Sequence, residues 1–403
     1  MGEKSVRTTK FITIFRNNIR NYSMFLILAL IMLIFAPMVS WRNFSARNIT
    51  NIFFQYSYVL ILAVGMVQCI IILGIDLSVG SVCAFAGAIT AMIYNTGVGM
   101  PITVISGLLI GLGVGAFQGL WIAYARIPAF IVTLAGMMLF RGLTYFVTHI
   151  NPISLNDDGY SYLATGTVDE VLKLAPIVDN GNLRLYPASL VVGGLLVLLF
   201  IVAELLTRRR KIANDFEVSS TPIFIGKLAI ISALVLSIAE RFASYRGLPI
   251  VALVVGVTVF VFHFILNNTV LGRYIYAVGG NSRSAKLSGI NSEFITFIVF
   301  CFMGMMTGLA AVVSTGYMNS ALPQAGQNFE MDAIAACYIG GVSAAGGIGT
   351  VVGVIVGGLV MSAINNGMSL MNLGQEYQYV VKGAVVLLAV YYDVYTRHKA
   401  GLG

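Results

Sequence analysis

The chain alternates between long apolar runs and short polar segments, and most runs have the length of a membrane-spanning helix. Such a helix needs about 20 apolar residues to cross roughly 30 Å of hydrocarbon. Helical runs without alternating strands exclude an outer-membrane barrel. We therefore expect an all-α, polytopic membrane protein with about twelve helices in one integral membrane domain over 1–403. The expected spans are Tyr22–Trp41, Phe54–Leu73, a helix that resumes after Gly80 and ends near Tyr94, Pro101–Tyr124, Pro128–Thr148, Pro187–Thr207, Pro222–Glu240, Leu248–Leu266, Phe294–Met318, Asp332–Gly346, Thr350–Asn372 and Tyr377–Tyr391.

The charged residues between the runs predict which loops face the cytoplasm. Basic residues are enriched in cytoplasmic loops, and positive charge is not selected on the outer face. The acidic stretch Ile150–Tyr186 is therefore expected outside, and the cluster Arg208–Lys211 and the loop 267–292 inside. The basic tail Arg397–Lys399 and a basic N-terminal segment are also expected in the cytoplasm. The basic residues of that segment are Lys4, Arg7, Lys10, Arg16 and Arg20.

Composition agrees with a membrane protein and excludes other classes. Hydrophobic residues make up 58% of the chain and charged residues 10%, and the mean hydropathy is +0.89. A soluble domain of this length has no core large enough for that much apolar surface. The net charge of +8 lies in tails and short loops, so it reflects membrane topology and does not indicate a nucleic-acid partner.

Residues for catalysis or metal binding do not gather at usable spacings in the sequence. The histidines lie far apart, and no Walker pattern ending in Lys-Ser or Lys-Thr occurs. We therefore expect no catalytic residue, no metal and no cofactor, and any ATP used would be hydrolysed by another chain. The four cysteines lie widely spaced within apolar runs and are expected to act as small buried hydrophobes; they are Cys69, Cys83, Cys301 and Cys337.

A basic, glycine-rich segment, Gly272–Asn291, separates two long apolar runs. Asn281 or Ser282 can cap the first free amides of a short helix, and Gly289 can take the left-handed conformation that ends it. We expect a small rigid knob on the water side, of the kind through which a soluble partner pushes a membrane domain. Its expected contact residues, with Ala285 on the contact face, are Gly279, Gly280, Asn281, Ser282, Ala285, Leu287, Ser288 and Gly289.

Two rows of glycines, Gly107–Gly119 and Gly349–Gly357, repeat at four-residue spacing and place small residues on one helix face. Backbones can approach closely at such faces, which drives helix packing in lipid. A direct role in lining a path is the alternative. Each row lies close to a polar-glycine step, Gln118-Gly119 or Asn366-Gly367. This likeness predicts a weak inverted repeat of the kind found in transporters.

Polar residues within apolar runs are costly and therefore suggest functional roles. Asp76, at a break between two helices, either caps the helix that restarts there or lines a path. Glu330 and Asp332 stand at another helix start, where negative charge suits the helix dipole. Arg141 and Lys382 are expected to form salt bridges or to reach the interface. Uncharged amides either tie helices together or bind a polar solute, and the expected path residues are Asp76, Gln68, Gln118, Phe130, Asn365 and Asn366.

Four of these segments, in this order, resemble the membrane subunits of bacterial sugar ATP-binding-cassette importers of the ribose, galactose and xylose type. They are Gly74–Gly80, Pro128–Leu134, Gly272–Asn291 and Asp332–Gly341. The insertion 150–240, with an extra helix pair at 187–240, resembles the longer xylose and multiple-monosaccharide permeases. The resemblance implies a multi-pass protein of the bacterial inner membrane that forms a homodimer with the pathway on its two-fold axis.

The same resemblance implies two further partners, a cytoplasmic ATPase subunit that engages Gly279–Ile290 and an extracytoplasmic sugar-binding protein. Two alternatives remain open. An ion-coupled secondary transporter would need a carboxylate and a cation in mid-membrane, for which Asp76 with Arg141 is the candidate pair. A permease of the same mechanism for nucleosides or branched-chain amino acids would differ only in its substrate.

Overall fold

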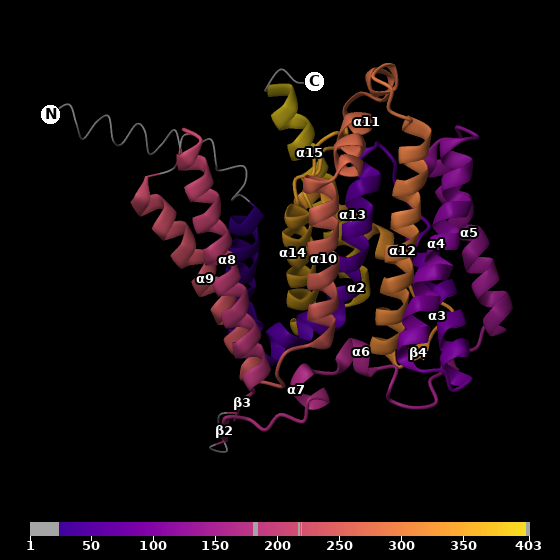
Figure 1. Cartoon of the computed structure of the whole chain (residues 1–403). Helices are drawn as coiled ribbons and strands as arrows, with labels where there is room; N and C mark the ends of the chain where they lie inside the picture. The colour runs from indigo at the N-terminus through magenta and orange to yellow at the C-terminus, as the bar shows by residue number, and fades with distance from the viewer. Residues whose placement is uncertain (1–23, 180–183, 217, 219, 400–403) are drawn as a thin grey trace.

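The computed structural model describes residues 24–179, 184–216, 218 and 220–399, and this part of the chain is mostly helical (Figure 1). Two shorter apolar helices are Met24–Met38 and α3 (Val79–Asn95). Eight described helices are long and apolar enough to cross a membrane: α2 (Ala46–Ile71), α4 (Met100–Ala123), α5 (Ala129–Thr148), α8 (Pro187–Ala213), α9 (Thr221–Ala243), α10 (Ile250–Asn268), α12 (Ser292–Met318) and α14 (Val351–Leu370). The other helices are η1 (Arg42–Phe44), α6 (Tyr162–Thr165), α7 (Val168–Val171), α11 (Val270–Leu287), α13 (Phe329–Ile339) and α15 (Gln375–Lys399). Strand β1 (Ile153–Ser154) pairs with β4 (Ser320–Ala321), and β2 (Val178–Asp179) pairs with β3 (Arg184–Leu185).

The expected fold class, an all-α polytopic membrane protein, is confirmed. The expected twelve spans and the inverted repeat stay predictions, since eight described helices meet the length and composition of a span. The element at α13 is shorter than the expected Asp332–Gly346, because Gly341 adopts a left-handed φ of +80° and breaks the helix. Residues 22 and 23 of the first expected span, and the basic N-terminal segment, lie outside the described residues.

Three helices extend past their expected ends. Helix α2 begins eight residues before Phe54, because the Ser45 hydroxyl caps it by accepting a hydrogen bond from Asn48 N at 3.3 Å. Helix α8 continues through Arg208–Lys211, whose cations suit the negative end of a helix. Helix α15 continues to Lys399.

The central contact of the bundle joins α4 to α12 through glycines. A side chain at Gly111 would collide with the carbonyl of Gly304, and one at Gly115 would collide with the carbonyl of Phe300. Backbones come this close only where side chains are absent. The row Gly107–Gly119 therefore packs two helices together, as expected.

The second row, Gly349–Gly357, packs α14 on α13 in the same manner. A side chain at Gly353 would collide with the carbonyl of Gly340, and one at Gly357 with the carbonyl of Ala336. Both rows thus hold neighbouring backbones in direct contact, which supports the packing interpretation over a path-lining one.

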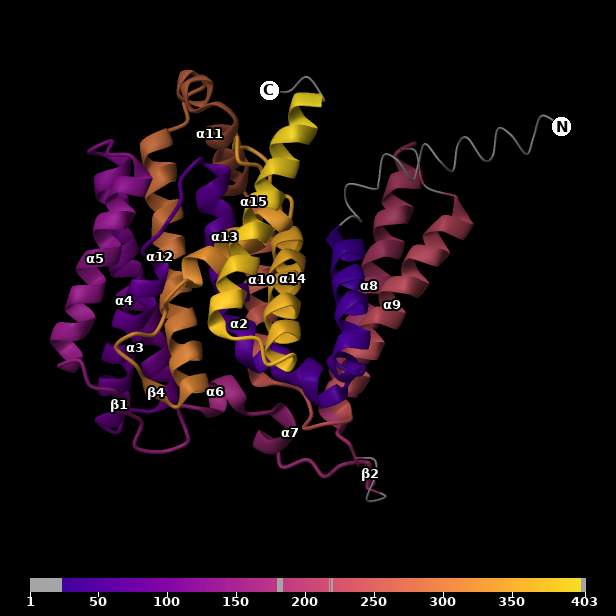
Figure 2. The same cartoon turned by 180° about the vertical axis from the view of Figure 1, so that it is seen from behind.

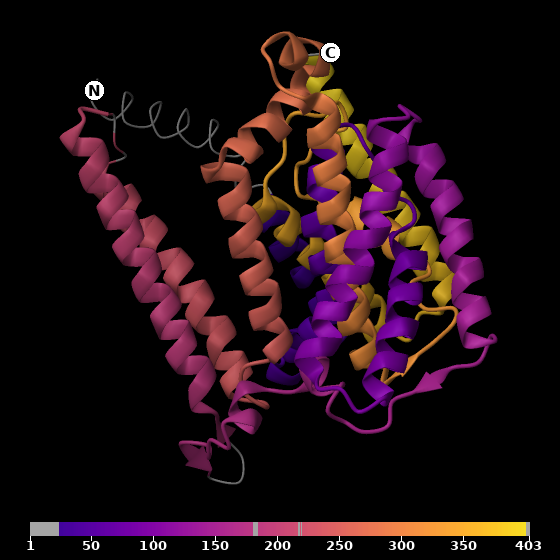
Figure 3. The ribbon, with the colours of Figure 1, turned by 45° about the vertical axis from the view of Figure 1, so that its right-hand side comes forward.

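Helices α8 and α9 form a pair that meets the bundle at one end and leans away from it at the other (Figures 1 and 3). The meeting point is built around the buried carboxylate of Asp169. It accepts hydrogen bonds from Ala188 N, at the start of α8, at 2.9 Å and from Leu248 N, before α10, at 3.1 Å. Arg246 pairs with the neighbouring Glu170 at 2.8 Å. The acidic loop therefore fixes the start of α8 and the segment that follows α9, which lie together at one end of the pair.

The two ends of the molecule carry different segments. Figure 2 shows α11, the turn between α8 and α9 and the last turns of α15 at one end, and β1, α6 and α7 at the other. The first end carries the cluster Arg208–Lys211, and the second carries the acidic stretch Ile150–Tyr186. This separation agrees with the expected sidedness, in which the first end is cytoplasmic.

The acidic stretch is tied to the bundle through Asp157. Tyr94 donates its hydroxyl proton to Asp157 Oδ1 at 2.5 Å, and Gly159 N donates to the same oxygen at 2.7 Å. These two hydrogen bonds lower the pKa of Asp157 below its usual value. The carboxylate is therefore charged at neutral pH, which keeps this end of the protein acidic.

Cysteine labelling tests the sidedness. Lys173 and Asp215 are exposed at opposite ends, and Lys173→Cys should react with an impermeant maleimide on intact cells. Asp215→Cys should react only after lysis. The four native cysteines are buried, so the background should be low. Labelling of both sites on intact cells, or the reverse pattern, contradicts the expected topology.

The glycine contact between α4 and α12 gives a second prediction. Gly111→Leu should lower the free energy of unfolding by at least about 1–3 kcal/mol, because the new side chain overlaps the backbone of α12. Gly113→Leu is the matched control, since a Cβ there meets no atom within 4 Å. Thermal unfolding of the purified variants measures the difference. Equal stability of the two variants contradicts close backbone packing.

Candidate functional site

The segment that the sequence predicts as a knob is a bent helix, α11. It is interrupted at Asn281, whose φ and ψ of −161° and 97° are not helical. Asn281 Oδ1 accepts a hydrogen bond from Ser284 N at 2.9 Å and so starts a short second helix, which Gly289 ends with a φ of +85°. The expected caps are confirmed. The expected loop from Gly272 is wrong, because residues 270–280 are helical as well.

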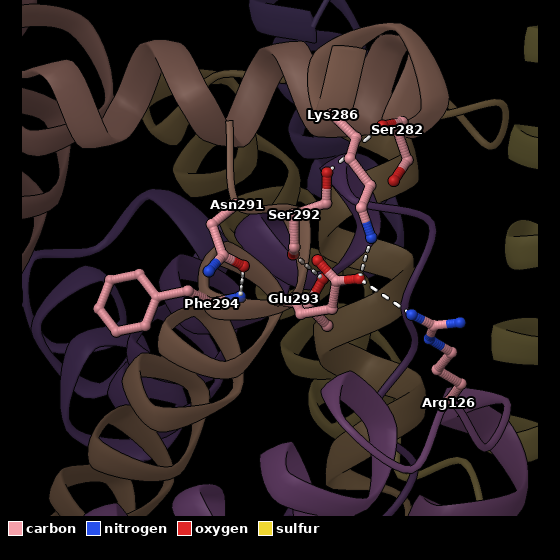
Figure 4. Close-up of polar contacts among 8 residues, drawn as sticks. Arg126, Ser282, Lys286, Asn291, Ser292, Glu293 and Phe294 are labelled. Atoms are coloured by element: carbon pink, nitrogen blue, oxygen red, sulfur yellow. Dashed lines mark hydrogen bonds and ion pairs between the residues drawn. The ribbon is translucent and has the colours of Figure 1, made fainter. Parts of the chain in front are cut away.

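The knob, defined as residues 281–289, is held to the body of the protein by charged contacts with the start of α12 (Figure 4). Lys286 Nζ lies 2.6 Å from Glu293 Oε1. Arg126 Nη2, from the turn between α4 and α5, lies 3.3 Å from the same oxygen. The acid in the first turn of α12 was visible in the sequence, but its contact with Arg126 was not, because 167 positions separate the two residues.

The outer face of the knob is exposed, and it carries one large apolar side chain. Leu287 exposes 85% of its surface. Ala285, by contrast, is 5% exposed and packs in the main apolar core, so its expected place on the contact face is wrong. The helix turns this residue toward the protein and its neighbours outward. The other expected contact residues that are exposed are Gly280, Asn281, Ser282, Ser288 and Gly289.

The base of the knob rests on the end of α2. Gly279 is buried, and a side chain there would collide with the carbonyl of Ile71, the last residue of α2. The same carbonyl accepts a hydrogen bond from Gly347 N at 2.9 Å. Gly279 therefore contributes to the base and not to the outer face. The first part of α11, which leads into the knob, is therefore in direct backbone contact with the end of α2.

Immediately beyond α2 the chain is non-helical over 74–78, and this break is fixed by its neighbours. Asp76 Oδ1 accepts hydrogen bonds from Ser78 N at 2.8 Å and from Ser78 Oγ at 2.6 Å. Gln118 Nε2 of α4 donates to Ser78 Oγ at 2.7 Å, and Thr133 Oγ1 of α5 donates to a carbonyl of the break at 3.2 Å. Asp76 is 4% exposed and bonds to Ser78, the residue before α3. No described side chain at this start accepts a hydrogen bond from the first turn of α3, so the expected cap is not formed.

The other expected path residues do not gather near Asp76. Asn366 of α14 exchanges two hydrogen bonds with Asn48 of α2, at 2.8 and 2.9 Å. Gln68 is fully buried and donates to a carbonyl of its own helix at 3.2 Å. Asn365 is 3% exposed, whereas Phe130 is 54% exposed on α5. Asn366 therefore ties two helices together, and Phe130 faces outward.

The two cations within the apolar runs have different partners. Lys382 Nζ lies 3.0 Å from Asp332 Oδ1 and joins α15 to α13, which confirms the expected salt bridge and leaves Asp332 as an ion-pair partner. Arg141 Nη1 donates to the carbonyls of Pro323 and Ala325 at 3.0 and 2.7 Å. Among the described residues Arg141 forms no salt bridge, because the loop before α13 supplies backbone acceptors, and its expected position near the interface stays a prediction.

No group of three or more potential metal ligands occurs among the described residues. All four cysteines are free and buried.

Residues 48–390 match the family model described as the branched-chain amino acid transport system / permease component. The chain is 36% identical over 383 residues to the xylose transport system permease protein XylH of Haemophilus influenzae, covering 95% of this chain and 98% of that protein. It is 36% identical to XylH of Escherichia coli K12, with 95% and 94% coverage. The ribose import permease protein RbsC of Escherichia coli K12 is 32% identical, with 91% and 92% coverage. No solved structure matches this chain.

Variants of the pair Asn48–Asn366 test whether Asn366 packs two helices together or lines the transport path. Asn366→Leu removes both hydrogen bonds between the two side chains and leaves the buried oxygen of the Asn48 amide unpaired, while its NH2 group still donates to the Asn43 carbonyl; stability should fall by about 1–3 kcal/mol. The double variant Asn48→Leu/Asn366→Leu should recover much of this loss, because no unpaired amide remains. Thermal unfolding of the purified proteins measures both effects. If Asn366→Leu keeps wild-type stability but loses transport, Asn366 belongs to the path.

Proposed function

The chain belongs to the family of branched-chain amino acid transport system permease components, and from this premise we propose that it is the membrane subunit of an importer for monosaccharides. The importer is of the ATP-binding-cassette type, and a separate subunit hydrolyses the ATP. The relatives named for xylose and ribose support a sugar as the solute. The observation that carries the proposal is the knob, a capped and anchored short helix with an exposed apolar side chain, whose base touches the end of a central helix.

In this proposal the partner contacts Leu287, and its movement reaches the membrane helices through the contact of Gly279 with α2. The ion pairs on Glu293 keep the knob and the start of α12 together as one unit. Because Gly279 contacts the carbonyl of Ile71, a push on the knob shifts the end of α2. The hydrogen bonds around Asp76 connect that end to α3, α4 and α5. A movement of the partner would thereby shift the helices that surround the break at 74–78.

The further partners follow from the two ends of the molecule. A cytoplasmic ATPase would dock at the end that carries α11, and a sugar-binding protein at the end that carries the acidic stretch Ile150–Tyr186. A second copy of this chain would complete the pathway at a two-fold axis. Both termini would then lie in the cytoplasm, with the protein in the bacterial inner membrane. No catalytic step is assigned to this subunit.

The ion-coupled alternative has weaker support. It needs Asp76 and Arg141 to act as a pair, but Asp76 is hydrogen-bonded to Ser78 and Arg141 to two backbone carbonyls. A purified complex with a stoichiometric ATPase subunit favours the importer, and proton- or sodium-driven uptake without such a subunit favours the alternative.

Leu287→Glu tests the docking surface. Burying the added charge against the ATPase is unfavourable, so we expect co-purification of the ATPase to fall at least about tenfold, which corresponds to roughly 1.4 kcal/mol of binding energy. Phe216→Glu is the matched control, because Phe216 is an exposed apolar side chain, 67% accessible, in the α8–α9 turn at the same end. Affinity purification through the ATPase measures both variants.

Gly289→Val gives an independent test, because a β-branched residue resists the φ of +85° that ends the knob. It should lower sugar-stimulated ATP hydrolysis while membrane insertion stays at the wild-type level. Normal docking and stimulation in both knob variants, with a loss in Phe216→Glu, would place the ATPase contact beside Arg208–Lys211 instead.

A further inference from the structure

A pocket of about 530 Å³ opens between the first turn of α3, the second half of α5 and the turn that leads into α13. This volume is in the range of small-molecule sites. Helix α5 contributes Arg141, Gly142 and Tyr145, which repeat at helical spacing and therefore share one face. The half of α5 that lines this pocket leads into the acidic stretch, at the end of the molecule opposite to α11 (Figures 1 and 3).

The polar side chains that line this pocket have hydrogen-bonding capacity to spare. Among the described residues, the carboxylate of Glu330 accepts a hydrogen bond only from its own backbone N–H, and no side chain binds the side-chain amides of Gln327 and Asn328. The hydroxyls of Ser81 and Tyr145 are likewise without a protein partner in the described part of the chain. Unmet polar groups are costly within a membrane and are normally kept for a ligand or ion path.

The shape of the pocket is built into the backbone. Gly80 and Gly326 are in direct contact, because a side chain on either would collide with the carbonyl of the other. Glu330 Oε2 lies 2.7 Å from the place that a Gly80 side chain would occupy. The two glycines therefore bring the break before α3 against the turn before α13 and leave room for the carboxylate between them.

Arg141 is fixed in the wall of the pocket by its bonds to the carbonyls of Pro323 and Ala325. Both bonds use Nη1, so its other N–H groups are available as donors. The pocket thus combines a carboxylate acceptor, amides and hydroxyls that both donate and accept, and an oriented guanidinium. A polyhydroxylated neutral molecule, in which each hydroxyl is both donor and acceptor, satisfies such a set, and its C–H faces can pack on Met137 and Met138, which also line the pocket.

We propose that this pocket is a binding site for the transported sugar in the outer half of the membrane subunit, with Glu330 as the main acceptor. The inference rests on the proposed function, since it identifies where the solute of that importer contacts this chain. It differs from the path expected from the sequence. Asp76, Gln118 and Asn366 bond to other side chains of the protein. The Glu330 carboxylate has no side-chain donor among the described residues.

The test uses the complete importer in liposomes, with its own ATPase and sugar-binding protein, and measures radiolabelled D-xylose delivered for each ATP hydrolysed. Gly142→Trp fills the pocket, and its Cβ meets no atom within 4 Å, so the fold should tolerate it. We expect at least about a tenfold loss of xylose per ATP in this variant. Glu330→Gln keeps the shape but weakens the acceptor, and an about three- to tenfold loss is expected.

Gly113→Trp and Glu376→Gln are the matched controls, because Gly113 is an open glycine on α4 and Glu376 is an exposed carboxylate outside the pocket. Both controls should keep the wild-type amount of xylose delivered for each ATP and the wild-type rate of basal ATP hydrolysis. If Gly142→Trp and Glu330→Gln deliver as much xylose for each ATP as the wild type, the proposal that this pocket binds the sugar is overturned. If the wild-type importer itself delivers neither xylose nor ribose, the proposed function has failed, which is distinguishable from failure of the pocket alone.

Discussion

Apolar side chains gain little by leaving lipid for one another, so the packing of this bundle depends on how closely its backbones approach. Glycine makes that approach possible at each critical contact. Gly111 and Gly304 join α4 to α12, Gly353 and Gly340 join α14 to α13, and Gly279 seats the knob on α2. The elements that are proposed to transmit movement and the elements that hold the bundle together therefore use the same kind of contact.

Features that depend on neighbouring residues could be predicted from the sequence. The caps at Asn281 and Gly289 follow from local backbone rules, and the hydrogen bonds of Asp76 to Ser78 span two residues. The inward turn of Ala285 could not be predicted, because the core against which it packs is formed by distant helices. The acceptors of Arg141 are similarly remote, since they lie about 180 positions along the chain, in a loop without a distinguishing pattern.

The inserted helix pair contributes little to the core. Only 6% of the apolar window of α8 and 11% of that of α9 are buried, compared with 83% for α2. The pair is attached at one end, where the two oxygens of Asp169 bond to the start of α8 and to the segment before α10 and where Phe242 of α9 packs on Phe53 of α2. A pair attached in this way can lean from the bundle without disturbing the contacts between α2, α4 and α12. The insertion is therefore structurally separable from the knob and the pocket.

The contact between Gly279 and the end of α2 has a thermodynamic consequence that runs in both directions. If a partner on the knob changes the preferred position of α2, and the helices around the break change with it, the free energy that couples the two sites is shared. Binding of a ligand at the far side must then change the partner's affinity for the knob by the same factor by which the partner changes the affinity for that ligand. Because backbone contacts backbone here, no flexible side chain lies between the two segments to weaken the coupling. The membrane subunit would therefore signal ligand binding to its partner as well as respond to the partner's movement.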